Sequence, residues 1–127
     1  DGVTTSIFTG IRAQTAMACK AINDDPHFQG EFNIVGISQG GMIARGVLEF
    51  CDLKGKIRNL ATIGSPNRGN GPAPDGHSGL LFDLLYYLRD EPEEFKNVQD
   101  KYGLAGLYRD PNHLEQYYEE CSFLPYL

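Results

Sequence analysis

The chain has 127 residues, enough for one domain with a hydrophobic core and too few for two. Seventeen acidic and eleven basic residues give a net charge of −6, which disfavours nucleic acid and anionic membranes as general partners. No apolar run approaches the roughly 20 residues of a membrane span, and no signal peptide opens the chain.

The first predicted element is a helix. Apolar and small residues recur at helical spacing over residues 4–23, which predicts one continuous helix. Asp24-Asp25-Pro26 should end it, because proline cannot continue a helix and acidic residues favour turns. Residues 27–31 then form a polar loop, in which we expect His27 to be solvated.

Residues 32–51 predict a strand, a sharp turn and a helix. The apolar stretch Phe32–Val35 predicts the strand, and a helix should begin near Met42 and end at Cys51. The turn between them, Gly36-Ile37-Ser38-Gln39-Gly40-Gly41, should hold the serine out at the carboxyl edge of a sheet. This arrangement is typical of a nucleophile elbow.

The glycines suit such a turn. Side chains two residues before and after Ser38 would crowd together, so we expect Gly36 and Gly40 because neither has a Cβ. Gly41 would keep the helix close to the sheet. Ser38 is therefore the predicted nucleophile, and the backbone N–H of Gln39, at a helix start, is the predicted oxyanion donor.

The same turn has an alternative interpretation. It could be a plain strand-to-helix connection in a doubly wound fold, with glycines that only allow close packing or cradle a phosphate. The phosphate-binding patterns GxGxxG and GxxxxGK[ST] are both absent from the chain, which weakens this alternative.

A second strand is predicted at residues 57–63, where Leu60, Ala61 and Ile63 form a run compatible with burial on both faces. Strand, helix and strand over this length form a crossover unit, so the strands should be parallel. The Gly- and Pro-rich loop at 64–78 would then lie at the same edge as Ser38. It could wall a substrate site, or it could be a simple surface connection.

The rest of the chain indicates a helical insertion. Residues 80–88 predict a helix with apolar side chains on nearly all of its faces. A further helix should begin at Pro92 and end near Gly103. The surplus of Leu, Tyr and Phe could line an apolar groove or could form helix-on-helix core. We expect residues 1–78 to be the elbow region and residues 79–127 the insertion.

The chemistry of a serine nucleophile needs two further groups. A base must take the serine proton and a carboxylate must orient that base, and in this fold both follow later strands. His77 in the loop and His113 in the insertion are candidates for the base, but neither follows a predicted strand. For each, the alternative is an ordinary surface histidine. Two parallel strands also make an incomplete sheet. We therefore expect a longer polypeptide, with the acid and base outside residues 1–127.

The number of cysteines, three, does not indicate the redox compartment of the protein. Cys19 lies late in the first predicted helix, and Cys51 ends the helix after Ser38, so both could lie beside the same sheet edge. A disulfide there would join the two helices, but composition alone slightly favours two buried free thiols. Cys121 has no visible partner.

The turn sequence 36–41, followed by a helix with Arg45 and Cys51, resembles the palmitoyl-protein thioesterases, which are α/β-hydrolases that remove fatty acyl groups from protein cysteines. The resemblance extends back through Thr15, Cys19, Ala21 and Asp25-Pro26. Forward it is looser, reaching Ile63-Gly64, the 77–83 stretch and Asp110-Pro111. It covers nearly the whole chain but only the central portion of such an enzyme.

The resemblance implies several further expectations. It implies a Cys19–Cys51 disulfide, and with it a lysosomal or secreted protein. Ser38 would be the nucleophile and Gln39 one oxyanion donor, while the second donor would precede residue 1 and the acid and histidine would follow residue 127. A family cysteine pair in the loop after the second strand has no counterpart here, so this loop departs from the family pattern.

The sequence thus predicts part of an α/β-hydrolase fold, with parallel strands, flanking helices and a helical insertion. The predicted function is a serine thioesterase acting on palmitoylated proteins, peptides or other fatty acyl thioesters, without metal or organic cofactor. A lipase or carboxylesterase is the nearest alternative, because residues 62–69 also resemble a lipase loop, and a non-catalytic binding module is another. We expect no turnover from the 127-residue segment alone.

Overall fold

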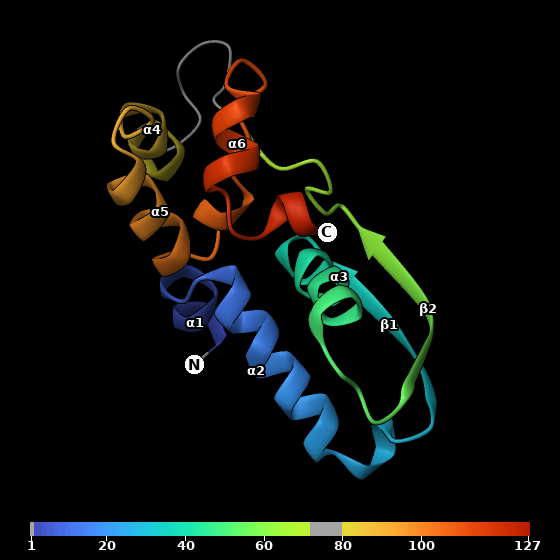
Figure 1. Ribbon diagram of the computed structural model, residues 1–127. Helices are drawn as coiled ribbons and strands as arrows, with labels where there is room; N and C mark the ends of the chain where they lie inside the picture. Colours follow the sequence, from blue (N-terminus) through green and yellow to red (C-terminus); the bar gives the residue numbers. More distant parts are fainter. Residues whose placement is uncertain (1, 72–79) are drawn as a thin grey trace. The chain divides into compact units, whose positions relative to one another are not determined.

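The computed structural model describes residues 2–71 and 80–127 (Figure 1). The chain forms two compact units. One, the sheet unit, comprises Arg12–Asn67 with Leu127, and the other, the helical unit, comprises Asp1–Ile11 with Arg68–Tyr126. The boundary that we expected after residue 78 falls within 72–79, outside the described residues, so it stays a prediction.

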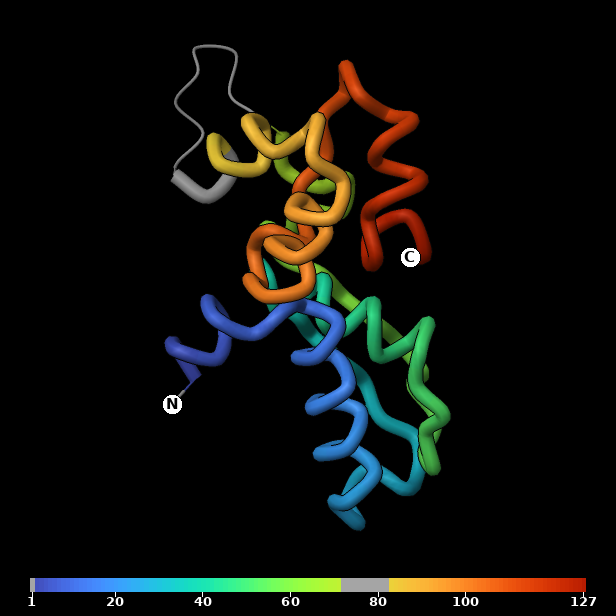
Figure 2. The backbone as a smooth tube through the Cα atoms, turned by 60° about the vertical axis from the view of Figure 1, so that its left-hand side comes forward, coloured from blue at the N-terminus to red at the C-terminus, as the bar shows by residue number. Residues whose placement is uncertain are grey.

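The sheet unit is built on two parallel strands, β1 (Glu31–Ile37) and β2 (Lys56–Ile63). Val35 pairs with Ala61 and Ile37 with Ile63, and the register shifts once, between Phe32 and Asn33. Helix α3 (Gln39–Phe50) connects the strands and packs on one face of them. In Figure 2 the tube passes from β1, in cyan, to α3, in green. The predicted α/β class and the parallel pairing are confirmed.

The turn between β1 and α3 is tighter than expected. The strand continues to Ile37 and the helix begins at Gln39, three residues before the expected start at Met42. Gly40 and Gly41 therefore lie inside the first helical turn. A single residue, Ser38, separates strand from helix.

Only one face of the described sheet is covered. The buried side of α3 includes Met42, Ala44 and Val47, whereas Leu48 is exposed. Apart from Gly36, no residue of β1 or β2, all of which the structure describes, is buried. Leu60 is half-buried and Ala61 and Ile63 are exposed, so the burial on both faces with which this run is compatible is not present among the described residues.

The first predicted helix is two helices, α1 (Gly2–Phe8) and α2 (Ile11–Asp24), so the expectation of one helix over 4–23 is wrong. The break is explained by contacts within the helical unit. A Cβ on Gly10 would overlap the backbone of Asp100, and the Ile7 carbonyl accepts a hydrogen bond from Gly103 N at 3.0 Å. Close packing here outweighs the helical pattern, and glycine is a poor helix former.

The turn after α2 is ordered by a side-chain cap. The 3₁₀ helix η1 (Pro26–Phe28) begins after Asp25, whose carboxylate accepts a hydrogen bond from His27 N at 2.9 Å. The His27 ring is exposed and also lies 2.8 Å from that carboxylate. Hydrogen bonds from His27 hold the pKa of Asp25 below its ordinary value.

Close packing accounts for two of the three expected glycines, Gly36 where β1 meets α3 and Gly41 where α3 meets the loop after β2. A Cβ on Gly36 would collide with the backbone of Gly41, and a Cβ on Gly41 would collide with the Ser65 side chain. A Cβ on Gly40 would point into open space. The crowding that we expected at Gly40 is therefore not present, because the helix has already turned that position outward.

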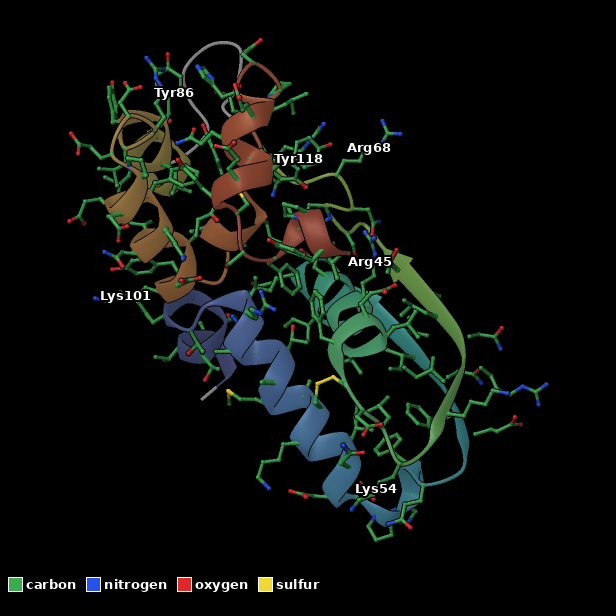
Figure 3. All side chains as sticks on the ribbon, viewed as in Figure 1. Arg45, Lys54, Arg68, Tyr86, Lys101 and Tyr118 are labelled. Carbon is green, nitrogen blue, oxygen red and sulfur yellow. A yellow bond between two sulfur atoms is a disulfide. The ribbon has the colours of Figure 1, made fainter. Side chains whose placement is uncertain are left out.

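A disulfide joins Cys19 of α2 to Cys51, directly after α3, with Cα atoms 5.8 Å apart. It lies between the two helices in Figure 3 as a yellow bond. Cys121 is a free, buried thiol whose sulfur accepts a hydrogen bond from Gln99 Nε2 at 3.2 Å. The disulfide implied by the resemblance is thus present in the structure.

The helical unit contains α4 (Leu80–Tyr87), α5 (Pro92–Lys101) and α6 (Leu114–Glu120), with short 3₁₀ turns η2 (Ala105–Leu107) and η3 (Leu124–Tyr126). Its core includes Leu85, Phe95, Leu107 and Phe123, which are fully buried. Asn70 bridges to Tyr108 through backbone hydrogen bonds, so the start of this unit is tied to its centre. The predicted helices after residue 79 are confirmed.

Within the described part of the chain, none of the helices has the length and apolar character needed to cross a membrane.

The cysteines lead to a first prediction. Burial raises the pKa of the Cys121 thiol to about 11, so this thiol stays protonated and unreactive at pH 8 in the folded protein. In the polypeptide containing this chain, iodoacetamide should modify Cys121 only after unfolding, and Cys19 and Cys51 only after reduction. Peptide mapping by mass spectrometry measures both.

The same shift has a consequence for stability. The thiol of unfolded Cys121 ionises near pH 8.5. The contribution of the buried thiol to the free energy of unfolding is therefore intact below that pH and is lost as the pH rises through about 11.

In the labelling experiment, modification of native Cys121 at pH 8, or of Cys19 without reductant, would contradict the packing described above.

The glycines lead to a second prediction. Gly36→Ala should lower the free energy of unfolding by on the order of 1–3 kcal/mol, because the added methyl collides with backbone that cannot move aside. The matched Gly40→Ala should be neutral or stabilising by about 0.5–1 kcal/mol, because alanine is the better helix former. Urea denaturation compares the two variants, and equal losses would show that the glycine spacing has another cause.

Candidate active site

Ser38 occupies the bend between β1 and α3. Its backbone has φ 53° and ψ −129°, and it is the only non-glycine residue with positive φ among those described. Its N–H donates to the Ile63 carbonyl at 2.9 Å, and its carbonyl accepts from Gly41 N at 3.0 Å. Ser38 is exposed, so its hydroxyl is presented at the carboxyl end of the strands.

Gln39 is the first residue of α3 and is partly exposed. Helical hydrogen bonding leaves the N–H groups of a first turn unused, and the helix dipole adds partial positive charge there. This is the end of α3 beside Ser38. The Gln39 side-chain Nε2 donates to Oε1 of Gln14, from α2, at 3.4 Å.

The loop after β2 begins next to Ser38, because Ile63 is the residue that pairs with the Ser38 N–H. Gly64 follows at φ 58°, and Ser65 lies against Gly41 in the first turn of α3. Residues 64–67 thus lie at the predicted edge. Of the rest of the expected rim loop, residues 68–71 belong to the helical unit and residues 72–78 are outside the described residues.

Arg45 ties this loop to α3. Its guanidinium donates to the Asn67 carbonyl at 3.3 Å and to the Leu127 carbonyl at 2.9 Å. Figure 3 shows Arg45 near the carboxyl end of β2. Asn67 Nδ2 in turn donates to Thr62 Oγ1 and the Ser65 carbonyl, both at 3.2 Å. The loop beside Ser38 is therefore held by side chains from both α3 and β2.

The two candidate histidines have different outcomes. His77 lies outside the described residues. His113 is in the helical unit, where its Nδ1 lies 2.8 Å from Oδ2 of Asp110. Asp110 is buried, with a side chain 4% exposed, and its other oxygen accepts from Asn112 N at 2.9 Å. His113 therefore has a structural partner, which sequence reasoning did not identify.

The pairing of Asp110 and His113 could have been anticipated from one signal. An Asp-Pro turn followed by a histidine three residues after the aspartate places both side chains on the same side of the chain. Burial raises the pKa of the neighbouring Tyr108, and the charge of Asp110 raises it further. The buried carboxylate of Asp110 therefore contacts His113 and also raises the pKa of Tyr108.

A hollow of about 380 Å³ lies around the start of α6. Its lining residues include His113, Arg89 and Glu119, and all of them except Leu114 have polar or charged side chains. It is thus a poor match for the apolar groove expected along residues 80–88. Of the described side chains in that stretch, Leu85 is buried in the core and Tyr87 is exposed, so the groove stays a prediction.

The structure offers no evident metal ligands in the part that it describes. Within residues 2–71 and 80–127, no three His, Cys, Asp or Glu side chains are grouped so that they could hold a metal ion. The roles of Ser38 and Gln39 and the absence of a cofactor stay predictions.

Comparison with known proteins agrees with the resemblance. The sequence model of the family described as palmitoyl protein thioesterase matches residues 2–127. Palmitoyl-protein thioesterase 3 of Dictyostelium discoideum is 27% identical over 124 residues, which are 98% of this chain and 41% of that protein. Palmitoyl-protein thioesterase 1 of Caenorhabditis elegans is 29% identical over 109 residues, 85% of this chain and 36% of that protein.

A third relative is a palmitoyl-protein thioesterase-dolichyl pyrophosphate phosphatase fusion of Schizosaccharomyces pombe, 28% identical over 111 residues, 86% of this chain and 18% of that protein. The chain thus spans well under half the length of these curated relatives. With a family match over nearly every residue and an α/β architecture to go with it, the chain belongs to the palmitoyl protein thioesterase family.

Proposed function

We propose that Ser38 is the nucleophile of a serine thioesterase. The observation that carries this proposal is the backbone of Ser38, a non-glycine residue at φ 53° between a strand and the start of a helix. Such strain is usually found where function requires it. The bend exposes the hydroxyl next to the N-terminus of α3, which is the arrangement that a nucleophile elbow needs.

The proposed reaction follows from this geometry. The Ser38 oxygen attacks the thioester carbonyl carbon while a base takes the hydroxyl proton, and the Gln39 N–H stabilises the negative oxygen of the tetrahedral intermediate. The carbon–sulfur bond then breaks, and the cysteine sulfur leaves with the proton from the base. Water attacks the acyl-serine, releases the fatty acid and restores the hydroxyl.

The remaining groups belong to the longer protein in this proposal. The second oxyanion donor would precede residue 1, and the acid and histidine would follow residue 127. The isolated segment should therefore be inactive. Activity, substrate and partners are accordingly proposed for the polypeptide that contains this chain.

The substrate class comes from the family. The relatives are named palmitoyl-protein thioesterases, so the proposed substrates are S-palmitoylated proteins and peptides or other long-chain acyl thioesters. The Cys19–Cys51 disulfide supports a lysosomal or secreted location, because such bonds persist in oxidising compartments.

The test uses the polypeptide containing this chain. A fluorophosphonate probe should label it, and Ser38→Ala should abolish the label and lower kcat for a palmitoyl thioester by about 10³-fold or more. The variant removes only the attacking oxygen, so its thermal unfolding should match that of the parent. Labelling that survives in Ser38→Ala would show that another residue is the nucleophile.

The leaving group separates the thioesterase from its alternatives. S-acyl and O-acyl substrates of equal chain length are compared by kcat/KM, with preference for the thioester expected. Preference for the oxygen ester would identify a lipase or carboxylesterase. A folded parent that neither takes up the probe nor hydrolyses either substrate would be a non-catalytic module.

A further inference from the structure

Gln14 is a buried polar side chain. It lies on α2 and is only 7% exposed, and its neighbours Ile11 and Thr15 are also buried. Burying an amide costs free energy unless it is hydrogen bonded, whereas leucine would fill this space without that cost. The side-chain oxygen of Gln14 accepts a hydrogen bond from Gln39 Nε2 at 3.4 Å.

Two further contacts between α2 and α3 lie at the opposite end of α3. The Cys19–Cys51 disulfide is attached directly after α3, and the Arg12 guanidinium lies 5.3 Å from the centre of the Phe50 ring. These contacts fix the end of α3 that is remote from Ser38. The hydrogen bond from Gln39 to Gln14 therefore fixes the catalytic end of the helix.

The position of Gln39 matters because of its backbone. An oxyanion donor must lie about 2.7–3.1 Å from the developing negative oxygen, and a small displacement weakens the interaction sharply. The Gln39 N–H belongs to the peptide group that follows Ser38, whose backbone is strained and would relax if it were released. A tether on the Gln39 side chain limits how far that peptide group rotates.

We propose that Gln14 is a positioning residue, which holds Gln39 so that its backbone N–H points at the oxyanion. The inference rests on the proposed function of Ser38 and Gln39. Gln14 acts through Gln39 and does not contact the substrate. Because the oxyanion forms only as the carbonyl is attacked, loss of the tether slows the chemical step and leaves substrate binding unchanged.

The experiment uses the polypeptide containing this chain and a palmitoyl thioester. Gln14→Leu should lower kcat about ten- to a hundredfold, with KM within about twofold of the parent value. Gln39→Leu removes the same hydrogen bond from a partly exposed position, so it should fold even where Gln14→Leu does not, with an equal effect. The double variant should be no slower than the slower single variant, because one interaction is lost in all three.

A matched control separates positioning from general damage. Arg12→Met removes a contact between the same two helices at the remote end of α3, so it should leave kcat unchanged even though stability falls. A trifluoromethyl ketone, which forms a tetrahedral adduct, should bind Gln14→Leu more weakly by the factor lost in kcat/KM. A substrate-binding defect would instead raise KM.

The outcomes distinguish this inference from the proposed function. A parent protein that hydrolyses the thioester, together with Gln14→Leu of unchanged kcat, overturns the role of Gln14 alone. Effects of Gln14→Leu and Gln39→Leu that multiply in the double variant also overturn it. A folded parent that never forms an acyl-serine overturns the proposed function, and the inference with it.

Discussion

The structure depends on how closely α3 packs on β1. A Cβ on Gly36 would collide with the backbone of Gly41, and a single residue, Ser38, separates the strand from the helix. That residue adopts a positive φ at a cost of about 1–3 kcal/mol. Pairing of its N–H with Ile63 and the helix that follows it hold the strained conformation in place.

The rest of the sheet unit stabilises this turn from several sides. The loop after β2 is bonded to Arg45, and α2 is joined to α3 by a disulfide at one end and a glutamine pair at the other. The loop after β2 and the glutamine pair lie beside the N-terminal turn of α3, where amide groups and partial positive charge converge, and the disulfide holds the other end of the helix. The proposed chemistry requires this rigidity, because an oxyanion donor that moves contributes little.

The sequence predicted the sheet unit better than the helical unit. Gly36, the apolar strand and the following helix are local signals, so the turn at Ser38 and the parallel strands could be inferred directly. The break at Gly10 could not, because it results from packing against Asp100, which is 90 residues away in the sequence. The Cys19–Cys51 bond required a resemblance, since spacing alone allowed free thiols. The spacing of Asp110 and His113 in an Asp-Pro turn is a local signal for their pairing, whereas the burial of Asp110 depends on packing and could not be inferred.

The most direct measurement is a crystal structure of the polypeptide containing this chain after reaction with an alkyl phosphonate. The account predicts an adduct on Ser38 with the residue still at positive φ, and a phosphonyl oxygen about 2.7–3.1 Å from the Gln39 backbone nitrogen. A phosphonyl oxygen directed away from the start of α3, or a Ser38 backbone relaxed to negative φ, would contradict it.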